Sequence, residues 1–125
     1  MKQFFKKYTQ AFDSLNAVAI ADLYTVPCSA SDVDGANVYV DRESLINKLN
    51  KNCSSMKSMG SRHSNFNILE ELEMGDTARA VNIAWRVSTT NEDIEFRSLY
   101  VCHKIDNQWF IFSANVYQGE FTDAI

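Results

Sequence analysis

The side chains best suited to proton transfer in this sequence are two histidines and a few carboxylates. An imidazole has a pKa of about 6.5, so His63 and His103 can each act as acid or base at neutral pH. Asp32 can act as a general base. It lies in the run 31–35, Ser-Asp-Val-Asp-Gly, which also reads as a solvated turn, the more common place for an aspartate. A lone histidine among apolar strand residues, as at position 103, is more often a hydrogen-bonded core residue than a catalytic one.

Other kinds of chemistry lack their residue patterns. No HExxH motif, histidine pair at i,i+4 or facial-triad spacing is present, so we expect no metal site. The three cysteines, Cys28, Cys53 and Cys102, have no CxxC spacing, which predicts buried thiols without zinc or disulfides. The sequence has no Gly-rich phosphate loop, GxSxG elbow or dinucleotide fingerprint. We therefore expect no cofactor.

Aromatic residues are the remaining signal of a site, because they make up 12% of a short chain. Small-ligand pockets are mostly apolar and contain few polar groups. Most such residues belong to a plain hydrophobic core, and both interpretations stay open. The aromatic candidates for a pocket lining are Tyr8, Phe12, Tyr24, Trp85 and Trp109.

Helical spacing dominates the first sixty residues. An aromatic stripe over residues 4–15 predicts a first helix. Asn16 caps a second, short helix that carries Leu23 and Tyr24 and that Pro27 stops. A turn signal at 34–35 predicts a hairpin within 29–40, and a third helix runs from a cap at Asp41 to Gly60.

From residue 61 onward, three turn signals separate four long stretches with the spacing of strands. In one of them, Val81, Ile83 and Trp85 alternate with smaller or polar residues, as in a half-buried strand. The order of helices and then a meander predicts an α+β domain in which a curved sheet wraps around helices and a pocket. The predicted strands cover residues 61–73, 77–89, 94–105 and 108–118.

This order resembles the NTF2-like superfamily of cone-shaped, cystatin-like domains, and more narrowly its SnoaL-like branch. The resemblance implies three N-terminal helices packed on a curved, mainly antiparallel sheet, in a single domain over residues 1–125. It rests on the stretches 12–16 (FDSLN), 21–24 (ADLY), 42–46 (RESLI), 62–65 (RHSN), 75–80 (GDTARA) and 104–109 (KIDNQW).

Ketosteroid isomerase-like members of the superfamily imply one set of roles. They place a general base at Asp32, which removes a proton next to a carbonyl, and a phenol at Tyr8, which stabilises the oxyanion. The second acid of that site falls near Val101, which cannot donate a hydrogen bond.

Scytalone dehydratase-like members imply a different set. They place an acid–base histidine at His63, facing the cavity, and an acid at Asp13 that can orient it. His63 can equally be a polar residue of the pocket lining or of the strand surface without a catalytic role. The two tyrosines of that family are replaced by Phe12 and Asp32. The candidate catalytic residues are thus His63, Asp32 and Asp13, and the candidate ligand-binding residues are Tyr8, Phe12, Tyr24, Trp85, His103 and Asn115.

Charge and composition argue against some classes of binding partner. A net charge of −4 and a pI of about 5.1 argue against nucleic acid, and no run of 18 apolar residues spans a membrane. The N-terminus has no signal-peptide core, and together with the cysteine pattern this favours a reducing cytoplasm. Residues 109–112 are apolar on both strand faces, and Ala80 and Ala84 are small, so a homodimer through the sheet is expected. Two functions stay open: a small-molecule-binding protein that acts as a cofactor-free lyase or isomerase, and a non-catalytic dimeric binding module.

Overall fold

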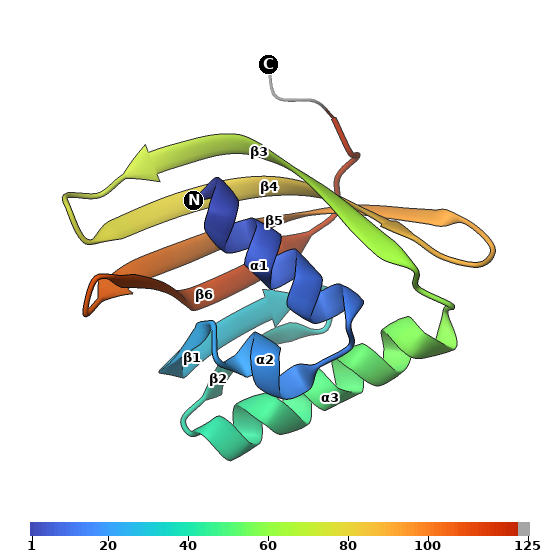
Figure 1. The fold of residues 1–125 in the computed structure, drawn as a ribbon, viewed down its shortest axis with the longest axis horizontal. Helices are drawn as coiled ribbons and strands as arrows, with labels where there is room; N and C mark the ends of the chain where they lie inside the picture. Colours follow the sequence, from blue (N-terminus) through green and yellow to red (C-terminus); the bar gives the residue numbers. More distant parts are fainter. Residues whose placement is uncertain (123–125) are drawn as a thin grey trace.

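The computed structural model of the chain describes residues 1–122. The chain forms three helices and six strands (Figure 1). The three helices and the first two strands lie in the first half of the chain, and four long strands make up the second half. The elements are α1 (Lys2–Asp13), α2 (Ala17–Ala21), β1 (Tyr24–Asp32), β2 (Gly35–Tyr39), α3 (Arg42–Ser58), β3 (His63–Glu73), β4 (Ala78–Ser88), β5 (Asp93–Ile105) and β6 (Gln108–Tyr117).

The two predicted helix caps are confirmed. Asn16 Oδ1 accepts a hydrogen bond from the Ala19 amide at 3.1 Å, which satisfies a free donor at the start of α2. Asp41 does the same for α3, accepting from the Ser44 amide at 2.8 Å. The α3 helix ends just before Gly60, whose φ of 70° lies in the left-handed region that glycine adopts without strain.

The second helix is shorter than the sequence predicts. It ends at Ala21, so Leu23 and Tyr24 lie outside it, and Pro27 is inside β1 instead of stopping a helix. Leu23 and Tyr24 are nevertheless buried, because the chain turns directly from α2 into the sheet. The apolar spacing of the segment thus reflects burial in the core and not a continuous helix.

The six strands form one sheet in the order β2-β1-β6-β5-β4-β3. All neighbours are antiparallel except β1 and β6, which run parallel, with Ser29 opposite Ser113 and Ser31 opposite Asn115. The four predicted strands after residue 61 are confirmed, and no helix interrupts residues 63–117. The predicted hairpin is also present, as β1 and β2 joined through Asp32 and Gly35.

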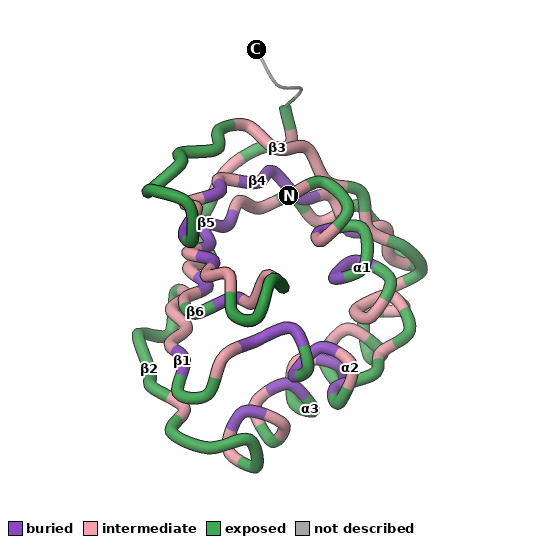
Figure 2. The backbone as a smooth tube through the Cα atoms, turned by 60° about the vertical axis from the view of Figure 1, so that its left-hand side comes forward, coloured by how far each residue is buried: buried purple, intermediate pink, exposed green. Residues whose placement is uncertain are grey.

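The curved sheet faces the helices with one side and leaves the other side uncovered by them (Figures 1 and 2). The core lies between the helices and the concave side of the sheet. Its largest fully buried side chains come from both layers and include Phe5, Ile20, Ile83 and Ile111. The predicted α+β, cystatin-like architecture is therefore confirmed. No helix in the described residues is long and apolar enough to cross a membrane.

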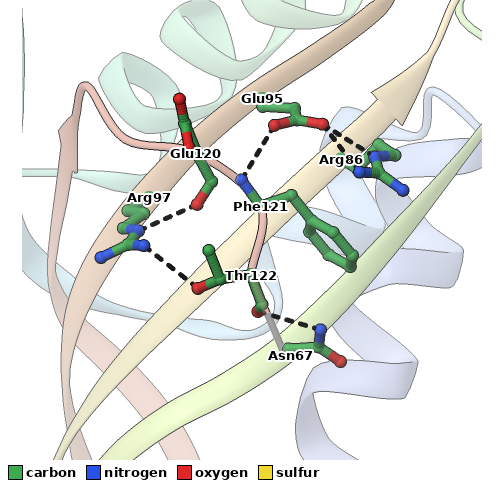
Figure 3. A network of polar contacts seen from close by, with 7 residues as sticks. All are labelled: Asn67, Arg86, Glu95, Arg97, Glu120, Phe121 and Thr122. Carbon is green, nitrogen blue, oxygen red and sulfur yellow. Dashed lines mark hydrogen bonds and ion pairs between the residues drawn. The ribbon is translucent and has the colours of Figure 1, made fainter. Parts of the chain in front are cut away.

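After β6 the chain crosses back over three strands of the sheet, and we call residues 119–122 the C-terminal strap (Figure 3). Its backbone is held by side chains. Arg97 donates to the Glu120 carbonyl at 3.0 Å, Glu95 accepts from the Phe121 amide at 3.0 Å, and Asn67 donates to the Thr122 carbonyl at 3.2 Å. The Phe121 ring lies 4.4 Å from the Arg86 guanidinium, which is paired with Glu95 at 2.9 Å.

Candidate functional site

A cavity of about 320 Å³ lies between the helices and the concave side of the sheet. This volume equals the share of about ten water molecules in the liquid, at the lower end of the range for small-ligand sites. The sheet contributes aromatic and aliphatic side chains, such as Trp85, Phe96 and Val116. The cavity therefore suits a small molecule with a largely apolar body.

Three buried tyrosines line this cavity, and we call Tyr8, Tyr24 and Tyr100 the phenol cluster. The hydroxyls of Tyr8 and Tyr24 are 2.8 Å apart, and Trp85 Nε1 donates to the Tyr100 hydroxyl at 3.1 Å. The cluster joins α1, β1 and β5: the Tyr100 ring packs edge to face on Tyr8, and the Tyr24 ring packs on Tyr8 at a tilt of 50°. It places phenol hydroxyls among the aromatic side chains of the lining.

Burial keeps the phenol cluster protonated. It raises the pKa of Tyr100 to about 12 and raises the pKa values of Tyr8 and Tyr24 above their ordinary range, because a phenolate would lose its hydration. Repulsion between two phenolates, chiefly with Tyr100, would add to the rise in the pKa values of Tyr8 and Tyr24. The cluster therefore offers neutral O–H donors to a ligand at neutral pH.

Asp32 lines the same cavity, where β1 ends. Its Oδ1 accepts from the Asp34 amide at 2.8 Å, and its Oδ2 lies 3.7 Å from Lys48 Nζ on α3. The two interpretations of the sequence thus coexist, because this carboxylate holds the hairpin turn and also reaches the cavity. The Asp32 side chain keeps 35% of its surface exposed, which leaves it open to a ligand.

His63 does not face the cavity, so the structure agrees with a strand-surface residue and not with the cavity-facing histidine that the resemblance implies. It is exposed, and its Nε2 lies 3.5 Å from the Ser88 hydroxyl on the neighbouring strand. The next residue, Ser64, is the one that lines the cavity. Strand parity explains the error, since Phe66 and Ile68 pack against the core with the even-numbered residues of β3.

Asp13 does not contact a histidine. Its carboxylate accepts two hydrogen bonds from Ser64, from the amide at 3.1 Å and from the hydroxyl at 2.8 Å. Asp13 therefore fastens the end of α1 to the start of β3, and it is not in the cavity lining. The expected acid–histidine pair is absent.

His103 and Asn115 also lie outside the cavity. The His103 ring packs edge to face on Phe112, which is 42% exposed on the face of the sheet away from the helices. Asn115 accepts from the Ser31 hydroxyl at 2.7 Å and donates to the Leu99 carbonyl at 3.1 Å. Both side chains contribute to the outer surface of the sheet. Of the nine candidate residues, those in the cavity lining are Asp32, Tyr8, Phe12, Tyr24 and Trp85.

Sequence reasoning missed the polar residues that α3 and β5 contribute. Lys48, Asn52 and Ser55 line the cavity from one side of α3, and Ser98 lines it from β5. Helix spacing could have identified two of them: Lys48 and Asn52 each follow a core residue, Leu45 and Leu49, by three positions, which puts them on the same side of the helix. In the described part of the chain, no three His, Cys, Asp or Glu side chains converge closely enough to hold a metal ion.

The sequence comparison matches residues 1–119 to a family model described as NTF2-like protein (DUF6841). The chain belongs to this NTF2-like family. No curated protein matches it at a significant level.

Solved structures share the NTF2-like fold at low sequence identity. An NTF2-like protein of unknown function from Shewanella oneidensis is 18% identical, with a TM-score of 0.75 over 91% of this chain and 93% of that one. A ketosteroid isomerase-like protein from Erwinia carotovora is 15% identical, with a TM-score of 0.70 over 92% and 90%. A protein from Novosphingobium aromaticivorans, provisionally assigned as a scytalone dehydratase, is 15% identical, with a TM-score of 0.68 over 99% and 89%. At this identity the likeness concerns the fold alone.

Proposed function

We propose that the protein binds a small, mostly apolar carbonyl compound in the cavity and moves a proton on it without a cofactor, as an isomerase or lyase does. The observation that carries the proposal is that the phenol cluster and the Asp32 carboxylate line the same cavity. One group can donate to an oxygen, and the other can accept a proton from carbon.

The phenol cluster has more O–H protons than internal hydrogen bonds to use them. Each of the three phenols carries one proton, and Tyr100 also accepts the Trp85 indole proton. The Tyr8 and Tyr24 hydroxyls bond to each other, which uses one phenol proton. The other two phenol protons have no acceptor in hydrogen-bond geometry among residues 1–122. A carbonyl oxygen supplies that acceptor, and the bond strengthens as negative charge develops on the oxygen.

Asp32 supplies the base in this scheme. Its carboxylate takes the proton from the carbon next to the carbonyl. The electron pair of that C–H bond forms a C=C bond, and the π pair of the carbonyl moves onto the oxygen. Return of the proton to another carbon of the conjugated system completes an isomerisation. Departure of a leaving group on the β-carbon, with that proton, completes an elimination.

The test is hydrogen exchange on carbonyl probes. In D₂O, cyclohexanone and 2-cyclohexenone are incubated with the protein, and loss of the α-proton signals is followed by NMR. We expect exchange faster than in buffer, loss of the acceleration in Asp32→Asn, and a reduction of about 10²-fold or more in Tyr8→Phe. The matched control is Asp34→Asn, the exposed neighbour in the same turn, which keeps the activity. Equal exchange rates in wild type and Asp32→Asn would rule out Asp32 as the base.

A non-catalytic binding module is the second candidate. The observation that favours it is the placement of His63 outside the cavity, together with the pairing of Asp32 to Lys48. In that case the same probes bind, and the protein does not accelerate exchange. Binding without exchange therefore selects this candidate.

We also propose a homodimer through the outer face of the sheet. Leu99 and Phe112 are 40% and 42% exposed there, and the helices leave this face free. Ala84 takes no part, because it is fully buried within one chain. Sedimentation of the wild type and of Phe112→Glu tests the proposal: we expect a dimer and a monomer, respectively, and a monomeric wild type at micromolar concentration contradicts it.

A further inference from the structure

The Ser98 hydroxyl is buried without a partner. Ser98 is 0% exposed, its Oγ makes no hydrogen bond within the described residues, and the side chain lines the cavity from β5. It lies near enough to Tyr100 to lower the pKa of that phenol, although burial outweighs this and the two groups do not meet in good hydrogen-bond geometry. A buried hydroxyl without a partner costs free energy, which a ligand can recover.

The Asn52 amide, on α3 across the cavity, also lacks a polar partner. It lines the cavity from α3, is half-buried, and makes no hydrogen bond or other polar contact with the residues that the structure describes. Nearby Lys48, in contrast, has an ion-pair partner in Asp32. An amide presents both a donor and an acceptor, so Asn52 can bind a hydroxyl or a carbonyl of a ligand.

Two aromatic rings line the cavity on the same wall as Ser98. The rings of Trp85 and Phe96 both line the cavity and are nearly parallel, with 23° between their planes and 6.4 Å between centroids. A planar ring can pack against these rings. Ser98 lies on the same sheet as these rings and Asn52 lies on α3 across the cavity, so a ring packed here can carry one oxygen toward each.

We propose that Ser98 and Asn52 are two ligand anchors, and that the cavity selects a single-ring compound with an oxygen function at each end. This deepens the proposed function and rests on it, since the oxygen at the Ser98 end is the one beside the phenol cluster. The oxygen at the other end meets Asn52, and the ring lies against Trp85 and Phe96. With about 320 Å³ available, one ring with short substituents fills the cavity.

Two probes that differ in one group test the inference. They are 4-hydroxyacetophenone and 4-methylacetophenone, which have nearly the same shape and differ by one hydroxyl. Dissociation constants come from NMR titration, and a shift of the Trp85 indole proton places the probe in the cavity. We expect 4-hydroxyacetophenone to bind about 10-fold more tightly, the worth of one well-formed hydrogen bond.

Variants then assign each end. Asn52→Leu should bring the two probes to within about 2-fold of one another, while Asn50→Leu, an exposed residue of the same helix, keeps the preference. Ser98→Ala should weaken both probes by about 5- to 10-fold and raise the Tm of the free protein by a few degrees, because the lost hydroxyl has no partner. Ser54→Ala, exposed on α3, changes neither quantity.

The two proposals fail in different ways. Probes that bind in the cavity with equal affinity, or a preference that survives Asn52→Leu, overturn the two-anchor inference and leave the exchange test untouched. Ser98→Ala with unchanged affinity also overturns it. If neither probe shifts Trp85 at millimolar concentration, both the inference and the proposed function are wrong.

Discussion

Replacing Asp13 by alanine tests whether this carboxylate is a structural tie between α1 and β3. The substitution removes two hydrogen bonds, from the Ser64 amide at 3.1 Å and from its hydroxyl at 2.8 Å. Hydrogen bonds to a charged acceptor contribute about 1.5–3 kcal/mol each, and this partly exposed site belongs at the lower end. We therefore expect the free energy of unfolding to fall by about 2–3 kcal/mol.

The expected change is easy to measure by thermal unfolding. At about 2.1 cal/mol/K per residue, the unfolding entropy of a chain of 125 residues is about 0.26 kcal/mol/K. A loss of about 2–3 kcal/mol then lowers the Tm by about 8–11 °C, followed by circular dichroism. Ser64→Ala removes one of the two bonds and should lower it by about half as much.

Two comparisons make the result decisive. Asp22→Ala removes an exposed pair with Arg42 and should change the free energy of unfolding by less than about 0.5 kcal/mol. The double variant Asp13→Ala/Ser64→Ala should cost less than the sum of the single variants, because both remove the same contact. A Tm for Asp13→Ala within about 2 °C of wild type would refute the structural role.

Three further outcomes follow from groups described above. The phenol cluster has raised pKa values, so its contribution to stability is complete below about pH 10 and is lost as the pH rises through the pKa values of the folded state, about 12 for Tyr100. Absorbance at 295 nm should show these phenols ionising together with unfolding. Ionisation without loss of structure would contradict this. Hydrogen bonds from the Phe121 amide and Arg86 lower the pKa of Glu95, so the C-terminal strap should be held above about pH 4.5 and released as the pH falls below that value. Release is measured as faster amide exchange at Phe121. An exchange rate that does not change with pH, after correction for the intrinsic rate, argues against this role of Glu95. Gly60→Ala should lower the free energy of unfolding by at least about 2 kcal/mol, because a Cβ at this φ of 70° overlaps the Thr90 side chain. Gly75 has a φ of 71° and open space around it, so Gly75→Ala should cost only the backbone strain of about 1–2 kcal/mol. Equal losses in the two variants would show that the overlap plays no role.

The parts of the fold that sequence predicts correctly are those that local patterns determine. The caps at Asn16 and Asp41 depend on a side chain and an amide three residues away, and the strands after residue 61 depend on turn signals between them. The end of α2 is predicted incorrectly because burial of Leu23 and Tyr24 has the same apolar signature in a helix and in the turn that leads into a strand.

The candidate site was harder to predict because it depends on which face of a strand points inward. In β3, Phe66 and Ile68 pack against the core, so the even-numbered Ser64 points inward and the odd-numbered His63 points outward. For β5, Tyr100 and Ser98 share the inner face, but the lack of a partner for Ser98 follows only from its neighbours on other strands. Contacts between distant segments, such as Asp32 with Lys48, have no local signature.

The place of β6 in the sheet has a consequence for how the chain folds during synthesis. This strand follows all the others in the chain, yet it lies between β1 and β5 and pairs with both. Until it has left the ribosome, the β1–β2 hairpin and the β3–β5 meander each present an open edge where β6 will pair, and nothing joins them into one sheet. Exposed strand edges of this kind are templates for aggregation. The nascent chain must therefore keep two half-sheets apart until β6 joins them, and loss of residues 108–117 would leave them separate.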